Sequence, residues 1–457
     1  MTRQILALVA ALTLVSGAAF ASGDQEAGAE GATQTVTVWS TDPATSWNSA
    51  VELLTQKYPS VNVDILHIPW SNTGWSQKVI SGMLSDDLPD LTLTAQGGVE
   101  WSVPVRGIYR PLNRFIEADN IDTSDYAEAL FWVQQYEGQA YALPLWQPFQ
   151  MLYYNKTLLR EAGLGGPPTT WDEMRDAVQK TTERDANGNL TQVGMPFSEG
   201  EVWIAFWLSN NWSANGYGFS RDGKTSTMNS PENVRAAEFY LELRKIMGTM
   251  EDIARVAPNI QGAADSFSLG KSAMTWVPAM LQLGLIQKYA PEDLDYGVGL
   301  MPAGPGGHQL IAQSGGPLLE IPAQARNPEG AWELIKILQS KEGQLAYVDD
   351  HWDTRATFPG RMSVAQSEEF RSRPGIGELV DLIDHVFPVG HAAHVFSTDD
   401  YYISGVVPAV DAFIYDKETP QAALDKATAA VQEKMDSLFA KLEERGLPVR
   451  MEYPRAE

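Results

Sequence analysis

Strand-like and helix-like segments alternate between residues 36 and 94, and this alternation limits the possible folds more than any other feature of the chain. Residues 36–39 and 61–65 are short β-rich runs. The stretch between them carries apolar residues at helical spacing: Trp47, Ala50, Val51, Leu54 and Tyr58. A second helix is predicted over 75–84 and a third strand over 91–94. Such alternation predicts an α/β fold with a largely parallel sheet that has helices on both faces.

The same two kinds of pattern continue along the rest of the chain. Strands are predicted over 151–154, 272–277 and 296–300, and a helix is predicted over 328–338. No internal repeat is present. A chain of 457 residues is long enough for two or three domains, so a second unit is expected to begin near residue 144.

Local signals mark where several of these elements begin and turn. Thr170 and Glu173 have the spacing of a capping box at the start of a helix. Asn187 and Gly188 form the dipeptide that is typical of a tight hairpin turn. Thr419 is the predicted cap of the longest helix, which follows it directly with a proline in its first turn.

The N-terminal residues have the pattern of a secretory signal. Arg3 supplies a positive charge, residues 5–15 are apolar, and residues 19–21 form an A-x-A cleavage site. The predicted signal peptide is therefore 1–21, and the Gly-, Ala-, Glu- and Gln-rich residues 22–33 are predicted to be a flexible leader. The chain has no cysteine, which excludes disulfides and the lipid-modified cysteine of many exported proteins. We expect a soluble protein in the periplasm or another extracytoplasmic space.

Charge and motif content exclude several classes of function. The formal net charge of −25 disfavours nucleic acid and anionic lipid surfaces as partners. No later apolar run is long enough to cross a membrane, so direct membrane insertion is not expected. The nucleophile-elbow, phosphate-loop and zinc-protease motifs are absent. His391 and His394 have helical spacing but no obvious third ligand. The sequence therefore predicts no catalytic residue, no metal and no cofactor.

The positions of the tryptophans indicate a binding function. Trp39, Trp70 and Trp146 each follow a short strand-like run. Ligands of open α/β sheets bind beyond the carboxyl ends of the strands, where a flat aromatic ring can stack on a sugar. Core packing is the alternative interpretation of each tryptophan, because large aromatic side chains also fill protein interiors.

Several segments, read in order, resemble the family 1 extracellular solute-binding proteins. These are the sugar receptors of ABC importers, and they include the maltodextrin-binding protein. The match extends from about residue 35 to 360. The similar segments are 36–40 with Trp47, KYPSVNVDILHIPW (57–70), SDDLPDL (85–91), LYYNK (152–156) with EAGL (161–164), PTTWDEM (168–174), FSLGKSAMTWVPA (267–279) and NPEGAWELIKIL (327–338).

This resemblance implies the two-lobed periplasmic binding protein fold of type II. Each lobe would be a mostly parallel sheet flanked by helices, with the ligand site between the lobes. The N-lobe would combine 34–144 with 272–316, and the C-lobe 145–271 with 317–457. Closure of the lobes about a hinge would bury a mono- or oligosaccharide, and the closed receptor would deliver it to the membrane permease subunits of an ABC importer. We expect the receptor to be a monomer.

The predicted ligand-binding residues lie after strands or in aromatic and amide clusters. Asp42 is a candidate acceptor for sugar hydroxyls, and its alternative role is a helix cap. Trp276 falls in a segment that supplies a stacking ring in the family, and Gly315 belongs to a glycine pair of the family. The full set is Trp39, Ser40, Asp42, Trp70, Gln96, Gly97, Trp146, Asn210, Trp212, Trp276, Gly315, Trp352 and Arg355.

Two other functions stay open at this point. A receptor for a polyamine or a glycerol-phosphate-type ligand would have the same fold, and its binding would weaken with salt. An exported carbohydrate-active enzyme would need two carboxylates facing each other across the cleft.

Overall fold

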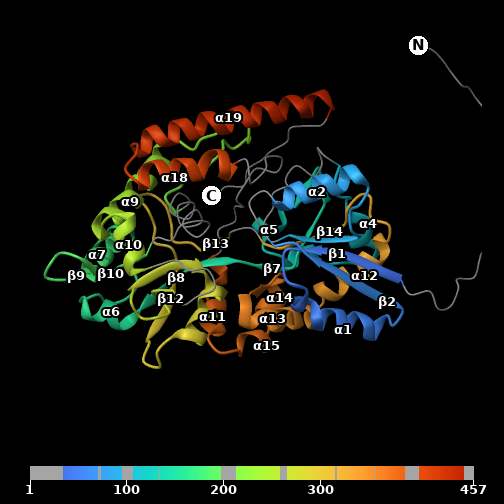
Figure 1. Ribbon diagram of the computed structural model, residues 1–457, viewed down its shortest axis with the longest axis horizontal. Helices are drawn as coiled ribbons and strands as arrows, with labels where there is room; N and C mark the ends of the chain where they lie inside the picture. The colour runs from blue at the N-terminus through green and yellow to red at the C-terminus, as the bar shows by residue number, and fades with distance from the viewer. Residues whose placement is uncertain are drawn as a thin grey trace, which may run out of the picture.

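The computed structural model describes residues 34–69, 74–94, 107–132, 134–196, 213–257, 265–313, 316–355, 357–385 and 401–446. These residues form two lobes, each built on its own sheet (Figure 1). In the described part of the chain no helix is both long and apolar enough to span a membrane.

The N-lobe contains a five-stranded sheet in the order β2-β1-β3-β14-β6. Strand β1 pairs in parallel with β2 and β3, as the strand–helix alternation predicts, whereas β14 pairs antiparallel with β3 and β6. The strands are β1 (Gln34–Ser40), β2 (Val61–His67), β3 (Leu91–Thr94), β6 (Leu143–Pro144) and β14 (Leu318–Glu320).

Both faces of the central strand β1 contribute to buried cores. Alternate residues of β1 point to opposite faces, so Val36 and Val38 enter the core under α1 and α12. Trp39 enters the smaller core under α2. The N-lobe helices are α1 (Asn48–Lys57), α2 (Gly74–Ser85), α4 (Asn113–Ala118), α5 (Glu128–Trp132) and α12 (Pro328–Gln339).

The C-lobe contains a sheet centred on β8, and all of its described pairs are antiparallel. Strands β11 and β12 flank β8 along its length, and β13 pairs with its first two residues. The strands are β8 (Phe149–Asn155), β11 (Met274–Pro278), β12 (Tyr296–Gly299) and β13 (Ala312–Gln313).

Helices pack around this second sheet and form two further cores. In Figure 1, α18 and α19 lie side by side at the top of the view, with α9 next to their left ends, and they share a core with α7 and α9. The C-lobe helices are α6 (Lys156–Glu161), α7 (Trp171–Thr181), α9 (Pro231–Met247), α10 (Met250–Val256), α11 (Ala279–Tyr289), α14 (Met362–Ala365), α15 (Glu368–Arg371), α16 (Ile376–Val380), α18 (Val407–Ile414) and α19 (Pro420–Glu444).

The remaining described elements include two short hairpins (β4 with β5 and β9 with β10), the pair formed by the distant strands β7 and β15, and one helix that contacts both lobes. Helix α13 (Lys341–Arg355) packs against α1 and α12 of the N-lobe and against α11 of the C-lobe. The short strands are β4 (Gln135–Tyr136), β5 (Gln139–Ala140), β7 (Trp146–Gln147), β9 (Glu183–Arg184), β10 (Leu190–Gln192) and β15 (Phe358–Pro359).

The expected division of the chain between the lobes is wrong in two places. Residues 272–316 were expected in the N-lobe, but β11, β12 and β13 all pair with β8. Residues 317–457 are expected in the C-lobe, but β14 pairs with β3 and β6, and α12 packs on α1 and β1. The division depends on strand pairing between distant segments, and local sequence does not specify that pairing. The chain stays in the C-lobe through β13 and returns to the N-lobe at β14.

The two-lobed α/β fold is confirmed, but one detail of the expected pairing is not. A mostly parallel sheet was expected in each lobe, and the described C-lobe pairs are antiparallel. The three strands that pair with β8 all run in the direction opposite to it. Helical crossovers produce parallel neighbours, and none of these three pairs is parallel.

The helix caps and the turn lie where the local signals predict them, but the capping box is incomplete. The Thr170 side chain accepts a hydrogen bond from the Glu173 amide and caps α7, whereas the Glu173 carboxylate accepts from the amide of Thr169, one residue before the cap. Gly188 lies at positive φ in the turn between β9 and β10. Thr419 caps α19 by accepting from the amide of Ala422.

Candidate functional site

Three segments connect the lobes and are bonded to one another. The first lies between β6 and β8, the second between β13 and β14, and the third between α13 and α14. The amide of Leu145 donates to the carbonyl of Pro317 at 2.9 Å, and the amide of Gly360 donates to the carbonyl of Leu145 at 2.9 Å. The Gln147 side chain donates to the carbonyls of Pro359 and Gly360 at 3.1 and 2.7 Å. We call these three segments the hinge.

Trp146 lies within the hinge, in β7, which pairs with β15. Its side chain is buried and belongs to the N-lobe core. The backbone here is closely packed, because a Cβ atom on Gly316 would approach the Trp146 carbonyl oxygen to 2.7 Å. Trp146 is therefore placed where the chain passes from one lobe to the other.

Asp42 lies just beyond the carboxyl end of β1 and is 3% exposed. Its Oδ2 accepts a hydrogen bond from the hydroxyl of Tyr347 at 2.7 Å. The same oxygen lies 3.4 Å from Nε2 of His351, which is also buried. Both partners come from α13, about 300 residues further along the chain. A carboxylate held in this way has a defined orientation and keeps capacity to accept further hydrogen bonds.

Ser40 supports this carboxylate from the last residue of β1. The Ser40 hydroxyl oxygen accepts from the amide of Asp42 at 3.0 Å and from the indole N–H of Trp47 at 3.2 Å. The Trp47 ring in turn packs edge-on against Tyr347, with centroids 5.8 Å apart. Ser40 and Asp42 are therefore brought together, as the sequence predicts, within a buried polar network.

Trp39 lies on the opposite face of the sheet. Its ring is buried beneath α2, where the ammonium group of Lys78 lies 4.3 Å from the ring centroid. A Cβ atom on Gly82 of the same helix would approach the ring to 2.8 Å. The structure thus places the Trp39 ring in helix–sheet packing and not beside Asp42.

Trp276 lies in β11, opposite Leu152 of β8. Its side chain is 3% exposed, and its indole N–H has no acceptor among the described residues. The hydroxyl of Thr94, at the carboxyl end of β3, and that of Thr357, beside the hinge, are likewise buried without a described partner. Buried polar groups are usually hydrogen-bonded, so the partner of each of these three groups lies outside the described residues, in water, a ligand or another part of the chain.

Trp352 is placed apart from this group, on the side of α13 that faces the C-lobe. Its indole N–H donates to the Gln287 side chain at 3.1 Å, and Arg373 lies 5.5 Å from its ring centroid. Arg355 is the last residue of α13. The remaining predicted binding residues lie outside the described residues: Trp70, Gln96, Gly97, Asn210, Trp212 and Gly315.

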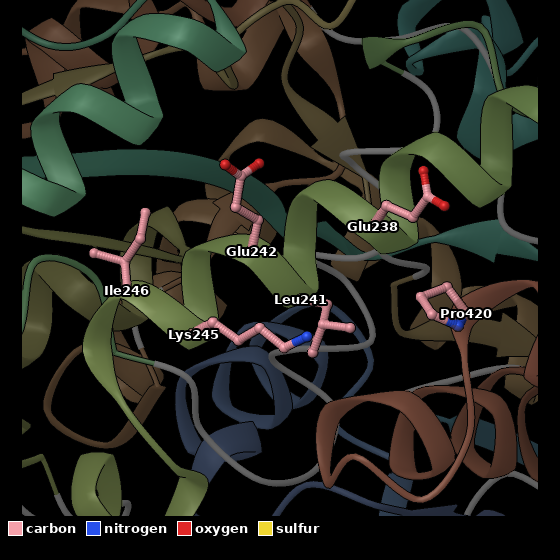
Figure 2. Close-up of a pocket in the computed structure, with 6 residues that line it drawn as sticks. All are labelled: Glu238, Leu241, Glu242, Lys245, Ile246 and Pro420. Atoms are coloured by element: carbon pink, nitrogen blue, oxygen red, sulfur yellow. The ribbon is translucent and has the colours of Figure 1, made fainter.

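A hollow of about 540 Å³ lies elsewhere in the C-lobe, between α9 and the start of α19 (Figure 2). Five residues of α9 and the first residue of α19 line it: Glu238, Leu241, Glu242, Lys245, Ile246 and Pro420. Glu242 is paired with Arg175 at 2.7 Å and Lys245 lies 4.0 Å from Asp416, so two of its charged groups take part in surface ion pairs. This hollow contains none of the predicted binding residues.

Ionisation of the described residues follows local hydrogen bonding and burial. Burial raises the pKa of Tyr153 well above its usual range, and its hydroxyl donates to the carbonyl of Ala279 at 2.6 Å. The described carboxyl groups with a shifted pKa are shifted downward by hydrogen bonds, as for Asp185 and Asp252 in a turn and a helix cap. A general acid needs the opposite shift. No cluster of three potential metal ligands occurs among the described residues.

Sequence reasoning missed Tyr347 and His351. Their i, i+4 spacing places both on one face of α13, and this spacing is the only local signal they carry. Their partner Asp42 is far away in sequence, and only the packing of α13 on the N-lobe brings the three residues together.

Comparison with known proteins places this architecture in a family. The family model for bacterial extracellular solute-binding proteins matches residues 39–345, about two thirds of the chain. A protein of Deinococcus radiodurans named as a probable ABC transporter-binding protein is 29% identical over 214 residues, which are 45% of this chain and 49% of that protein.

Solved structures show the same fold. The sugar-binding protein MalE from Xanthomonas citri has a TM-score of 0.73 at 18% identity, with 90% of this chain and 100% of that chain covered. The structure of CpMnBP1 with mannotriose bound has a TM-score of 0.71 at 21% identity, covering 87% of this chain and 100% of that one. The family match and the two-lobed architecture together show that this chain belongs to the bacterial extracellular solute-binding protein family.

Proposed function

We propose that this protein is an extracytoplasmic receptor that binds a mono- or oligosaccharide between its lobes and delivers it to the permease subunits of an ABC importer. The observation that carries the proposal is the likeness over both lobes to sugar-binding structures, one of them with mannotriose bound. The relative from Deinococcus radiodurans supports the link to an ABC transporter. The protein acts by binding and release, without turnover.

The geometry supports a site for a neutral, hydroxyl-rich ligand. Asp42 is an oriented acceptor at the carboxyl end of β1. Trp276 of the C-lobe combines an aromatic ring with an indole N–H that lacks a described acceptor. A stacked ring contributes about 0.5–1.5 kcal/mol beyond its buried area. We therefore propose Asp42 and Trp276 as the main described contacts, one from each lobe.

Export and oligomeric state complete the proposal. Cleavage after Ala21 would release a soluble monomer that begins at Ser22. Mass spectrometry of the exported chain tests the cleavage site, and light scattering tests the monomer. A mature mass that still includes residues 1–21 would contradict the signal peptide.

Thermal unfolding of the chain from Ser22 onward tests the function directly. The panel contains mannobiose, mannotriose, maltose, tagatose, spermidine and glycerol 3-phosphate. A ligand present at about 100 times its Kd stabilises the folded state by about 2.7 kcal/mol, which gives a clear rise in Tm. We expect this rise with one class of sugar.

Two variants separate specific binding from general effects. Asp42→Asn should reduce the sugar-induced rise in Tm. Asp64→Asn makes the same charge change on an exposed position of β2 and should leave the rise unchanged. A rise with spermidine or glycerol phosphate alone would indicate a receptor for a charged ligand, and recovery of a chemically changed sugar would indicate an enzyme. Either result would overturn the proposal.

A further inference from the structure

Helix α13 is anchored in both lobes through neighbouring residues. Tyr347 belongs to the N-lobe core and the next residue, Val348, belongs to a C-lobe core. On the N-lobe side, Asp350 accepts from the amide and hydroxyl of Ser49 at 2.7 and 2.8 Å. On the C-lobe side, Trp352 bonds to Gln287. The helix ends at Arg355 and leads directly into the third segment of the hinge.

The contact between α13 and Asp42 is short and buried. The Tyr347 hydroxyl donates to the carboxylate at 2.7 Å, and a hydrogen bond to a charged acceptor is stronger than one between neutral groups. Because Asp42, Tyr347 and His351 are all buried, water competes little for these contacts. The Tyr347 and His351 rings also pack against each other, with centroids 4.2 Å apart and planes tilted by 33°, which limits the rotamers of both rings.

His351 lies near the same carboxylate, one helical turn further along α13. Its Nδ1 lies 2.9 Å from the carbonyl oxygen of Tyr347, and its Nε2 lies 3.4 Å from the carboxylate of Asp42. A carbonyl oxygen and a carboxylate are both hydrogen-bond acceptors. An imidazole nitrogen that carries a hydrogen is attracted to such an oxygen, whereas a nitrogen without one is repelled by it. The ring therefore contacts the backbone of α13 through Nδ1 and places Nε2 near the carboxylate at the end of β1.

We propose that Tyr347 and His351 are positioning residues that orient the Asp42 carboxylate for its ligand and couple Asp42 to α13. Through these contacts, a ligand bound at Asp42 in the N-lobe acts directly on α13, the helix that precedes the hinge. This inference rests on the proposed function, because it takes Asp42 as a ligand contact.

Binding measurements on Tyr347→Phe test the positioning role. The ring and its packing remain, and only the hydroxyl that holds Asp42 is lost. We expect affinity for the sugar that raises Tm to fall at least tenfold in isothermal titration calorimetry. In the Asp42→Asn background the same substitution should cause no further loss, because the carboxylate it orients is already gone.

Tyr126→Phe is the matched control. Tyr126 is buried in the same N-lobe core, and its hydroxyl donates to the Gln339 side chain at 2.8 Å. Its removal should lower Tm and leave sugar affinity unchanged. Equal losses of affinity in Tyr126→Phe and Tyr347→Phe would overturn the inference, as would independent losses from Tyr347→Phe and Asp42→Asn.

Hydrogen exchange without ligand separates this inference from the proposed function. Asp42→Asn should speed amide exchange across residues 341–355 relative to Asp64→Asn. If the wild-type protein binds no member of the panel, the proposed function fails, and the coupling is still decided by this comparison. Identical exchange rates in α13 for the two variants would overturn the coupling.

Discussion

Asp42 illustrates how a residue's neighbours in sequence and its neighbours in space lead to different conclusions. From the sequence it is an acidic residue after a strand, with a ligand contact or a helix cap as its two possible roles. In the structure its carboxylate contacts Tyr347 and lies near His351, while its amide donates to Ser40. The cap interpretation finds no support, because the 3-10 turn at 44–47 has no side-chain cap.

Asp119 provides a residue-scale prediction for acid stability. Its carboxylate accepts from the indole N–H of Trp332 at 2.6 Å, and this bond, with Lys336 nearby, lowers the pKa of Asp119. A carboxyl group with a lowered pKa in the folded state contributes stability above its unfolded pKa, near 3.9, and this contribution is lost as pH falls through the lower folded value. We expect Asp119→Asn to be less stable than wild type at pH 7.

Urea unfolding between about pH 2 and 7 measures this effect. The difference in unfolding free energy between wild type and Asp119→Asn should shrink as the pH falls below about 4. A constant difference across the whole range would contradict the prediction. Asp64→Asn is the control, because this carboxylate is exposed on β2 and its neutralisation should give curves parallel to wild type.

At the scale of elements, helix boundaries depend on local chemistry whereas the hinge depends on close backbone contact. Thr419 and the proline after it specify the start of α19 within a few residues of sequence. No comparable signal within a few residues of sequence specifies the hinge. Its segments come from three distant parts of the chain, and their backbones bond to one another through Leu145, Pro317 and Gly360.

Gly360 provides the element-scale prediction. A Cβ atom there would approach the carbonyl oxygens of Pro144 and Leu145 to 2.6 and 2.7 Å, both of which are backbone atoms of the first hinge segment. Gly360→Ala should therefore destabilise the fold by about 1–3 kcal/mol, because the segments must separate. Gly165→Ala is the control, since its Cβ would meet nothing within 4 Å. Equal denaturation midpoints for Gly360→Ala and wild type would contradict the close contact.

At the scale of the whole molecule, the two lobes are connected by three hinge segments and by α13. A ligand that contacts both lobes stabilises the closed arrangement by its difference in affinity for the two states. A ligand that contacts one lobe alone leaves that equilibrium unchanged. The choice of Asp42 and Trp276 as contacts from different lobes therefore implies closure on binding.

Small-angle X-ray scattering measures that closure. Saturating sugar should lower the radius of gyration of the wild-type protein, and Asp64→Asn should respond in the same way.

Affinity for a neutral sugar should also stay nearly constant between about 0.05 and 0.5 M NaCl, because screening acts on charges. Binding without any change in scattering would contradict closure, and a steep loss of affinity with salt would indicate a charged ligand.

The sequence alone determined the elements that depend on neighbouring residues. Strands β1, β2 and β3, helices α1, α2, α7 and α19, and the turn at Gly188 all follow from periodicity, caps and turn chemistry within a few residues. The family resemblance added the two-lobed fold. The helices, strands and turn depend on residues that are close in sequence, and the fold is indicated by several similar segments in the same order. Both can therefore be predicted from one sequence.

Only the tertiary structure decided which lobe each later strand joins and which residues surround Asp42. Strand β14 joins the N-lobe sheet and β11 joins the C-lobe sheet because of hydrogen bonds across distant segments. Tyr347 meets Asp42 because α13 packs on the N-lobe. Residues about 300 positions apart leave no periodic or spacing signal in one sequence. Their proximity follows from the packing of whole elements, and that packing depends on the complete core.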